Sequence, residues 1–164
     1  MGCDDRPPLE NTPTSQLIRR SHNNRLGAVY SALEGFWEAR HHAVAAAAGN
    51  AGALRRDAYT VVLFESSVST VIDHDFRSEP ANLLNTVLRY GSTGGTNFTG
   101  AIQTAKSLVE RHWSNERYVV LCAIEGCKLI RMSRTPVVIF LSDGECSIAD
   151  ETMQDLCRRS IALG

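Results

Sequence analysis

The sequence lacks a charge excess of either sign. Seventeen Lys and Arg residues stand against eighteen Asp and Glu residues, which leaves a formal net charge of -1 over 164 residues. Proteins that bind phosphate backbones or anionic lipid through electrostatics carry an excess of positive charge. The near-neutral balance therefore argues against nucleic acid and membrane surfaces as partners.

Long apolar runs and paired cysteines are also missing. No stretch approaches the roughly 20 apolar residues that a membrane-spanning helix needs, and the first thirty residues hold no signal-peptide core. The five cysteines are odd in number, and no two are spaced as C-x-x-C, the pattern of zinc and redox sites. We expect free thiols in a reducing compartment, and hence a cytoplasmic protein.

The composition is that of a globular protein, with 43% apolar and 21% charged residues. Residues 1–23 hold three of the five prolines and little periodicity, which predicts a flexible leader. Apolar residues then recur at steps of three and four in four stretches, which predicts four helices. These stretches are 24–42, with an extension through the alanines that follow, 80–88, 97–109 and 150–161.

Strand patterns lie between the predicted helices. Two runs of β-branched and aromatic residues, 59–64 and 68–72, flank Glu65-Ser66-Ser67, which predicts a β-hairpin. Residues 137–141 are an unbroken apolar run, typical of a strand that is covered on both faces of a sheet. Helices interleaved with strands favour an α/β fold with a mostly parallel sheet.

Two polar loops follow elements of this fold. Residues 91–100 form the glycine-rich loop GSTGGTNFTG, and Ser142-Asp143-Gly144 closes the apolar run. In α/β folds, ligands bind where loops converge at the carboxyl ends of strands, and a hydroxyl beside a carboxylate suits Mg²⁺. Taken singly, each loop has a simpler interpretation, as a turn in which Thr96 or Asn97 caps a helix and as a strand-ending turn.

Together and in this order, these features resemble the von Willebrand factor type A (vWA) domain. The resemblance covers about residues 24–164, with Gly94-Gly95-Thr96-Asn97 similar to the family's threonine motif and 137–144 to its fourth strand and S-D-G. It implies an α/β fold with a three-layer α/β/α, Rossmann-like sheet that carries helices on both faces. It also implies a non-enzymatic protein-interaction module.

The resemblance further implies a metal-ion-dependent adhesion site, at which an acidic residue of a protein partner completes the coordination of Mg²⁺ or Mn²⁺. By the match of motifs, Thr96 and Asp143 are the candidate metal ligands. Gly95, Asn97, Ser142 and Gly144 are the candidate residues of the partner-binding loops. No catalytic residue is implied.

The sequence departs from the family at its first strand, which there ends in D-x-S-x-S and supplies metal ligands. The residues before Asn24 hold neither a hydrophobic strand nor that motif. Glu65-Ser66-Ser67-Val68-Ser69 reads as E-x-S-x-S, but it follows the first helix and is not expected to replace the motif. Because Mg²⁺ demands several oxygen ligands, we expect Thr96 and Asp143 to hold it weakly at most.

Residues 118–134 form an atypical insertion, and the family continues into further strands where this chain ends, so 24–164 is expected to be a partial vWA-like domain. The insertion is either translated intron or a replacement for the first strand through Tyr118–Ile124.

Two other functions stay open. One is a nucleotide-binding enzyme of Rossmann-like fold, although neither G-x-G-x-x-G nor Gly-Lys-Ser/Thr is present; the other is a gene fragment without autonomous function.

Overall fold

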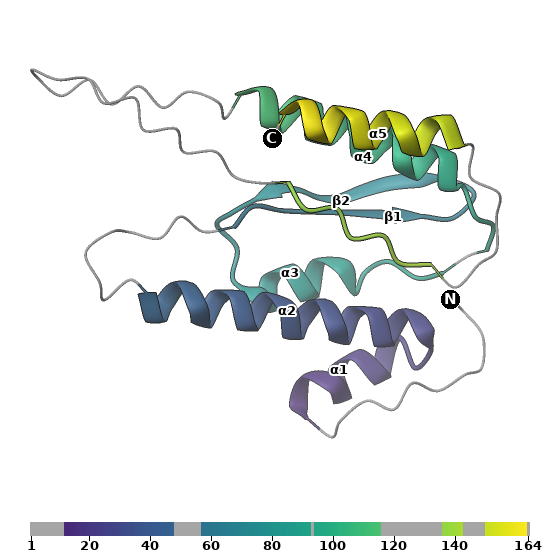
Figure 1. Cartoon of the computed structure of the whole chain (residues 1–164). Helices are drawn as coiled ribbons and strands as arrows, with labels where there is room; N and C mark the ends of the chain where they lie inside the picture. Colours follow the sequence, from purple (N-terminus) through teal and green to yellow (C-terminus); the bar gives the residue numbers. More distant parts are fainter. Residues whose placement is uncertain (1–11, 48–56, 93, 116–135, 143–149, 164) are drawn as a thin grey trace, which may run out of the picture. The chain divides into compact units, whose positions relative to one another are not determined.

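The computed structural model describes residues 12–47, 57–92, 94–115, 136–142 and 150–163. The elements are α1 (Pro13–Ser21), α2 (Arg25–Ala47), β1 (Tyr59–Phe64), β2 (Val68–Asp75), α3 (Pro80–Val87), α4 (Phe98–Asn115) and α5 (Asp150–Leu163) (Figure 1). They fall into two compact units. Of the described residues, the first unit holds those up to Thr96 with Leu141 and Ser142, and the second holds the rest. Each unit is described by itself.

Helix α1 corrects the prediction of a flexible leader over residues 1–23. The Thr12 hydroxyl accepts a hydrogen bond from the Ser15 N–H at 3.1 Å, and the Ser15 hydroxyl accepts one from the Thr12 N–H at 2.9 Å. Pro13 occupies the first helical position, where its missing N–H costs nothing. Ile18 is fully buried in the core. The prediction is therefore wrong for residues 13–21.

Helix α2 begins where the periodicity predicts. The Asn24 side-chain oxygen accepts a hydrogen bond from the Gly27 N–H at 3.1 Å, which caps the first turn. The helix runs to Ala47, so the alanine run does extend it beyond His42. Tyr30 and Trp37 are its largest buried side chains, and they face the core of the first unit.

The predicted hairpin is confirmed. β1 and β2 pair antiparallel from Tyr59 opposite Asp75 to Phe64 opposite Val68, and they lie side by side in Figure 1. Helix α3 is confirmed as well, starting at Pro80 and packing against β2 and α2. The buried core that these elements share consists of Ile18, Leu26, Tyr30, Trp37, Ile72, Leu83, Leu84 and Val87.

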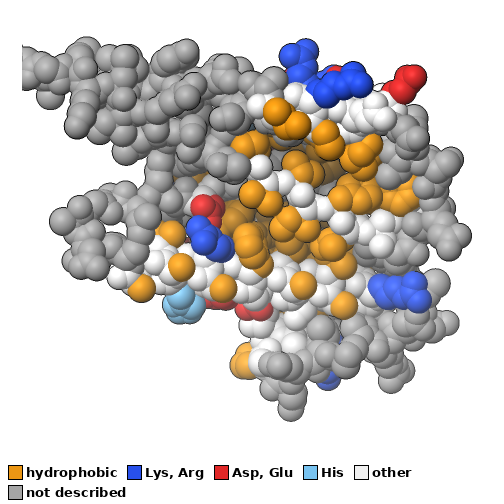
Figure 2. Space-filling model, viewed as in Figure 1, with side chains coloured by type: hydrophobic (Ala, Val, Ile, Leu, Met, Phe, Trp, Pro, Cys, Tyr) orange, Lys and Arg blue, Asp and Glu red, His pale blue; other side chains and the backbone are white. Residues whose placement is uncertain are grey.

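The prediction of a doubly covered strand at 137–141 is wrong. This segment, the yellow-green trace of Figure 1, forms no ladder with any described strand. Its five side chains are between 38 and 78% exposed. Figure 2 shows many hydrophobic side chains on the viewed face. A run of this kind is buried when it lies in a sheet whose two faces are covered, and within the described residues the segment belongs to no sheet.

In the second unit, α4 and α5 pack against each other through apolar residues and two ion pairs. Phe98, Ile102 and Leu108 of α4 and Leu156 of α5 are buried. The helix predicted at 150–161 is confirmed as α5, although two apolar residues of its periodic pattern, Cys157 and Ile161, are exposed, Ile161 to 80%. Among the helices in the described ranges, none combines the length and apolar character that crossing a bilayer requires.

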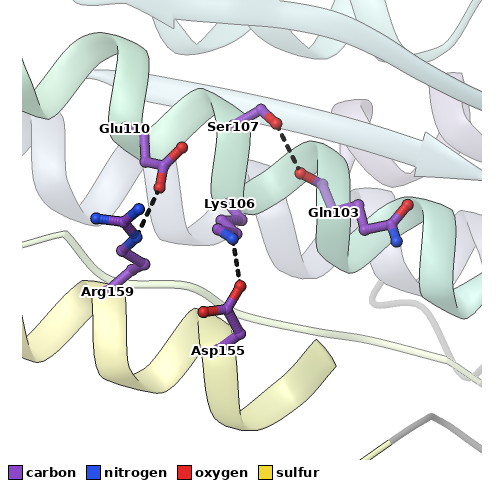
Figure 3. Close-up of polar contacts among 6 residues, drawn as sticks. All are labelled: Gln103, Lys106, Ser107, Glu110, Asp155 and Arg159. Atoms are coloured by element: carbon purple, nitrogen blue, oxygen red, sulfur yellow. Dashed lines mark hydrogen bonds and ion pairs between the residues drawn. The ribbon is translucent and has the colours of Figure 1, made fainter. Parts of the chain in front are cut away.

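The ion pairs join Lys106 to Asp155, and Glu110 to Arg159 at 3.1 Å (Figure 3). The hydrogen bond from Lys106 holds the pKa of Asp155 below its ordinary value. Because Asp155 and Arg159 are well exposed and Lys106 is partly exposed, salt screens their attraction.

Asp155→Asn is therefore expected to lower the thermal midpoint of the chain slightly at low salt. The loss should shrink in 1 M NaCl, because the screening length there is only about 3 Å. A carboxylate with a depressed pKa contributes stability above its unfolded pKa of 3.8 and loses it as the pH falls through the folded pKa. The difference between wild type and variant should therefore vanish on acidification below pH 3.8. Circular dichroism melts against pH measure it. Glu151→Gln, an exposed carboxylate of the same helix, is the control; a loss of equal size there would contradict the assignment to the ion pair.

Two polar contacts hold the C-terminal end of α3. The Tyr30 hydroxyl donates to the Tyr90 carbonyl at 2.9 Å, and His22 Nε2–H donates to the Leu88 carbonyl at 2.9 Å. The rings of His22 and Tyr30 pack edge to face, with centroids 5.3 Å apart. Burial raises the pKa of Tyr30 to about 12. These contacts fix the point at which the glycine-rich loop begins.

Tyr30→Phe is expected to lower the free energy of unfolding by about 1–2 kcal/mol at pH 7, because the Tyr90 carbonyl loses its donor. Because the pKa of Tyr30 is higher in the folded state, its neutral hydroxyl stabilises the folded state below the unfolded pKa of 10.0. That contribution is lost as the pH rises through about 12. The gap between wild type and variant should therefore close across this range. Urea titrations at each pH measure it.

Tyr90→Phe is the matched control, because it keeps the acceptor carbonyl and removes only an exposed ring hydroxyl. If Tyr90→Phe costs as much as Tyr30→Phe, the interpretation of the contact is incorrect.

Candidate functional site

The predicted threonine loop leaves α3 and leads into α4. Two consecutive glycines, Gly94 and Gly95, have φ angles of +99° and +82°. This left-handed region is open to glycine at little cost, whereas a Cβ makes it unfavourable. Thr96 follows directly and is exposed. The backbone conformation of the two glycines therefore shapes the turn that precedes Thr96.

The loop lies against the turn between β1 and β2. The Ser66 N–H donates to the Gly94 carbonyl at 3.4 Å, and a Cβ built on Gly95 would lie 3.0 Å from both the Cβ and the backbone nitrogen of Ser66. A side chain at Gly95 would crowd Ser66, which would have to shift by a few tenths of an ångström. The E-x-S-x-S segment, expected to lie away from the site because it follows the first helix, is thus next to the threonine loop.

Glu65 opens this turn, and its carboxylate is only partly satisfied. Oε1 accepts a hydrogen bond from the Ser67 hydroxyl at 3.2 Å, and the Glu65 N–H donates to the Ser67 carbonyl at 2.8 Å. Oε2 is buried and has no hydrogen-bond partner. A buried carboxylate oxygen without a donor is unfavourable unless a cation or a proton compensates it. The sequence pattern includes Glu65 in the E-x-S-x-S segment but does not favour it as a ligand, because the order of elements along the chain does not show which turns meet in space.

Asn97 is the N-cap of α4. Its side-chain oxygen accepts a hydrogen bond from the Gly100 N–H at 2.9 Å, and a Cβ on Gly100 would collide with the Asn97 amide. Of the two residues considered as caps, the structure shows this geometry for Asn97. The cap satisfies a backbone N–H in the first turn of α4.

The second predicted loop is described only in part. Ser142 is exposed and belongs to the same compact unit as Thr96. Asp143 and Gly144 lie outside the described residues, as does the predicted insertion at 118–134. The pairing of Thr96 with Asp143, and the two explanations of the insertion, therefore stay predictions.

The donors described near this loop are oxygens. Over the described ranges, no three His, Cys, Asp or Glu side chains come together as a metal cluster. The loop offers the hydroxyl of Thr96, and the neighbouring turn offers the hydroxyl of Ser67 and the unsatisfied carboxylate oxygen of Glu65. Such oxygen donors suit a hard cation such as Mg²⁺ rather than zinc. The donor set fits the group that the predicted adhesion site requires.

Comparison with known proteins identifies the family of the chain. The family model of the von Willebrand factor type A domain matches residues 14–145, which is more than half of the chain. The chain belongs to the vWA domain family. The match begins before Asn24, the expected start, and so includes α1 among the residues of the vWA domain. No curated protein and no solved structure matches the chain significantly.

Family membership establishes the α/β class for this vWA domain, and it indicates a protein-interaction module in general. The threonine loop and the hairpin both lie inside the matched range, so both are parts of the vWA domain. The described sheet of this vWA domain is the two-stranded antiparallel hairpin.

Gly95→Ala is expected to destabilise the vWA domain by about 1–3 kcal/mol, since it combines a left-handed backbone with a close contact to Ser66. Gly94→Ala shares the positive φ but has no atom within 4 Å of its Cβ, so it should cost less. Gly91→Ala, with neither feature, should be nearly neutral. Urea titrations of the three variants rank these costs, and equal effects of Gly94→Ala and Gly95→Ala would show that the loop does not press on the turn.

Proposed function

We propose that this vWA domain is a non-enzymatic interaction module that captures an acidic side chain of a partner protein through a weakly held Mg²⁺ ion. Thr96 and Asp143 are the proposed protein ligands, and Gly95, Asn97, Ser142 and Gly144 shape the loops around them. The observation that carries the proposal is the threonine loop itself, in which an exposed Thr96 follows two left-handed glycines within a vWA match.

The loop is held by two sets of contacts within the first unit, and this supports a binding role. The Tyr30 and His22 contacts hold the end of α3, and Ser66 meets Gly94 and Gly95. A loop held in place before binding loses little conformational freedom when it meets a ligand, so more of the contact energy appears as affinity. An exposed hydroxyl on such a loop is suited to present an oxygen to a cation.

A bound Mg²⁺ would supply positive charge and open coordination positions. With few protein ligands, several of those positions hold water, and a carboxylate from another protein can replace one of them. The domain alone then binds the ion weakly, and the ion and the partner strengthen each other's binding.

The proposal includes the three-layer arrangement, with helices on both faces of the sheet, because the two polar loops meet at one sheet edge in such folds. It also includes a cytoplasmic location. Cys157, the cysteine that the described part of the chain contains, is free, in keeping with the scattered cysteine pattern.

The test uses an array of acidic peptides, each paired with a peptide in which Asn and Gln replace Asp and Glu. We expect wild-type chain to bind a subset of the acidic peptides in millimolar Mg²⁺, but neither their amide partners nor any peptide in EDTA. Asp143→Ala should abolish this binding while the thermal midpoint stays close to that of wild type. Binding that persists in EDTA, or that survives Asp143→Ala, would contradict the proposed function.

A further inference from the structure

The carboxylate of Glu65 is the described acidic group of the first unit that the structure leaves with a buried, unsatisfied oxygen. Ser67 donates one neutral hydrogen bond, and only to Oε1. No Lys, Arg or His ion pair reaches Glu65 among the described residues. A carboxylate in this state is a strong acceptor for a cation, because a cation removes the cost of its burial.

The turn that contains Glu65 lies next to the threonine loop, where other oxygen donors are found. This turn touches the threonine loop through Ser66, at Gly94 by a 3.4 Å hydrogen bond and at Gly95 by close contact. The next residue after this contact is Thr96, an exposed hydroxyl. A carboxylate and two hydroxyls thus come from two adjoining loops of one compact unit, and hard divalent cations take oxygen ligands of this kind.

We propose that Glu65 is a carboxylate ligand of a divalent-cation site formed with the hydroxyls of Ser67 and Thr96. The site compensates for the missing D-x-S-x-S motif with residues from the turn between β1 and β2. The inference rests on the proposed function for the purpose of the ion, but its donors all lie in the described residues and do not include Asp143.

The probe is Mn²⁺, whose free concentration electron paramagnetic resonance measures directly in the presence of the full chain. Glu65→Gln keeps the shape of the side chain and removes its charge. We expect it to weaken Mn²⁺ binding by roughly tenfold or more, a loss that even outer-shell partners of metal ligands cause. Ser67→Ala is expected to weaken binding by a smaller factor. Glu38→Gln is the control, because Glu38 is an α2 carboxylate outside this turn that pairs with His42 at 3.7 Å.

Thermal melts with and without Mn²⁺ give a second readout and show whether each variant is folded. Mn²⁺ should raise the midpoint of wild type and of Glu38→Gln, but not that of Glu65→Gln. Wild-type affinity for Mn²⁺ in a folded Glu65→Gln variant would overturn the inference, and so would the absence of millimolar Mn²⁺ binding to wild type.

The two proposals fail in different ways. If Mn²⁺ binds in a Glu65-dependent manner but acidic peptides bind equally in EDTA, the cation site stands and the proposed function does not. If peptide capture needs Mg²⁺ and Asp143 while Glu65→Gln changes nothing, the proposed function stands and the role of Glu65 is refuted.

Discussion

The close approach of Gly95 to Ser66 is the contact on which the candidate site depends. A Cβ at Gly95 would lie 3.0 Å from Ser66, so a glycine with positive φ is what lets the threonine loop rest on the turn between β1 and β2. Tyr30 holds the chain just before this loop through the Tyr90 carbonyl. The core of the first unit is thereby linked to the start of the loop that contains Thr96.

Local signals in the sequence predicted the elements that depend on local structure. Steps of three and four identified α2, α3 and α4, and the β-branched runs around Glu65–Ser67 identified the hairpin. Helix α1 was missed although Thr12, Pro13 and Ser15 form its start, because clustered prolines were interpreted as a leader. The run at 137–141 was misjudged, since hydrophobicity alone does not say whether strands pair with a segment.

The candidate site was predictable in one half only. The motif around Gly94–Asn97 has a distinctive spacing, and it lies within the family match over residues 14–145. The neighbourhood of Glu65 was not predictable, because it arises from a tertiary contact between a hairpin turn and a loop that begins more than twenty positions later. The turn that contains Glu65 becomes a candidate binding site only because the threonine loop packs against it.

The most direct test of this account locates a bound cation on the folded chain. Paramagnetic broadening by substoichiometric Mn²⁺, followed in the amide NMR spectrum, falls steeply with distance from the ion. The account predicts that the amide signals of Ser66, Ser67 and Thr96 broaden first. Broadening that begins elsewhere, for example at His41 and His42, or that is spread evenly over the chain, would contradict it.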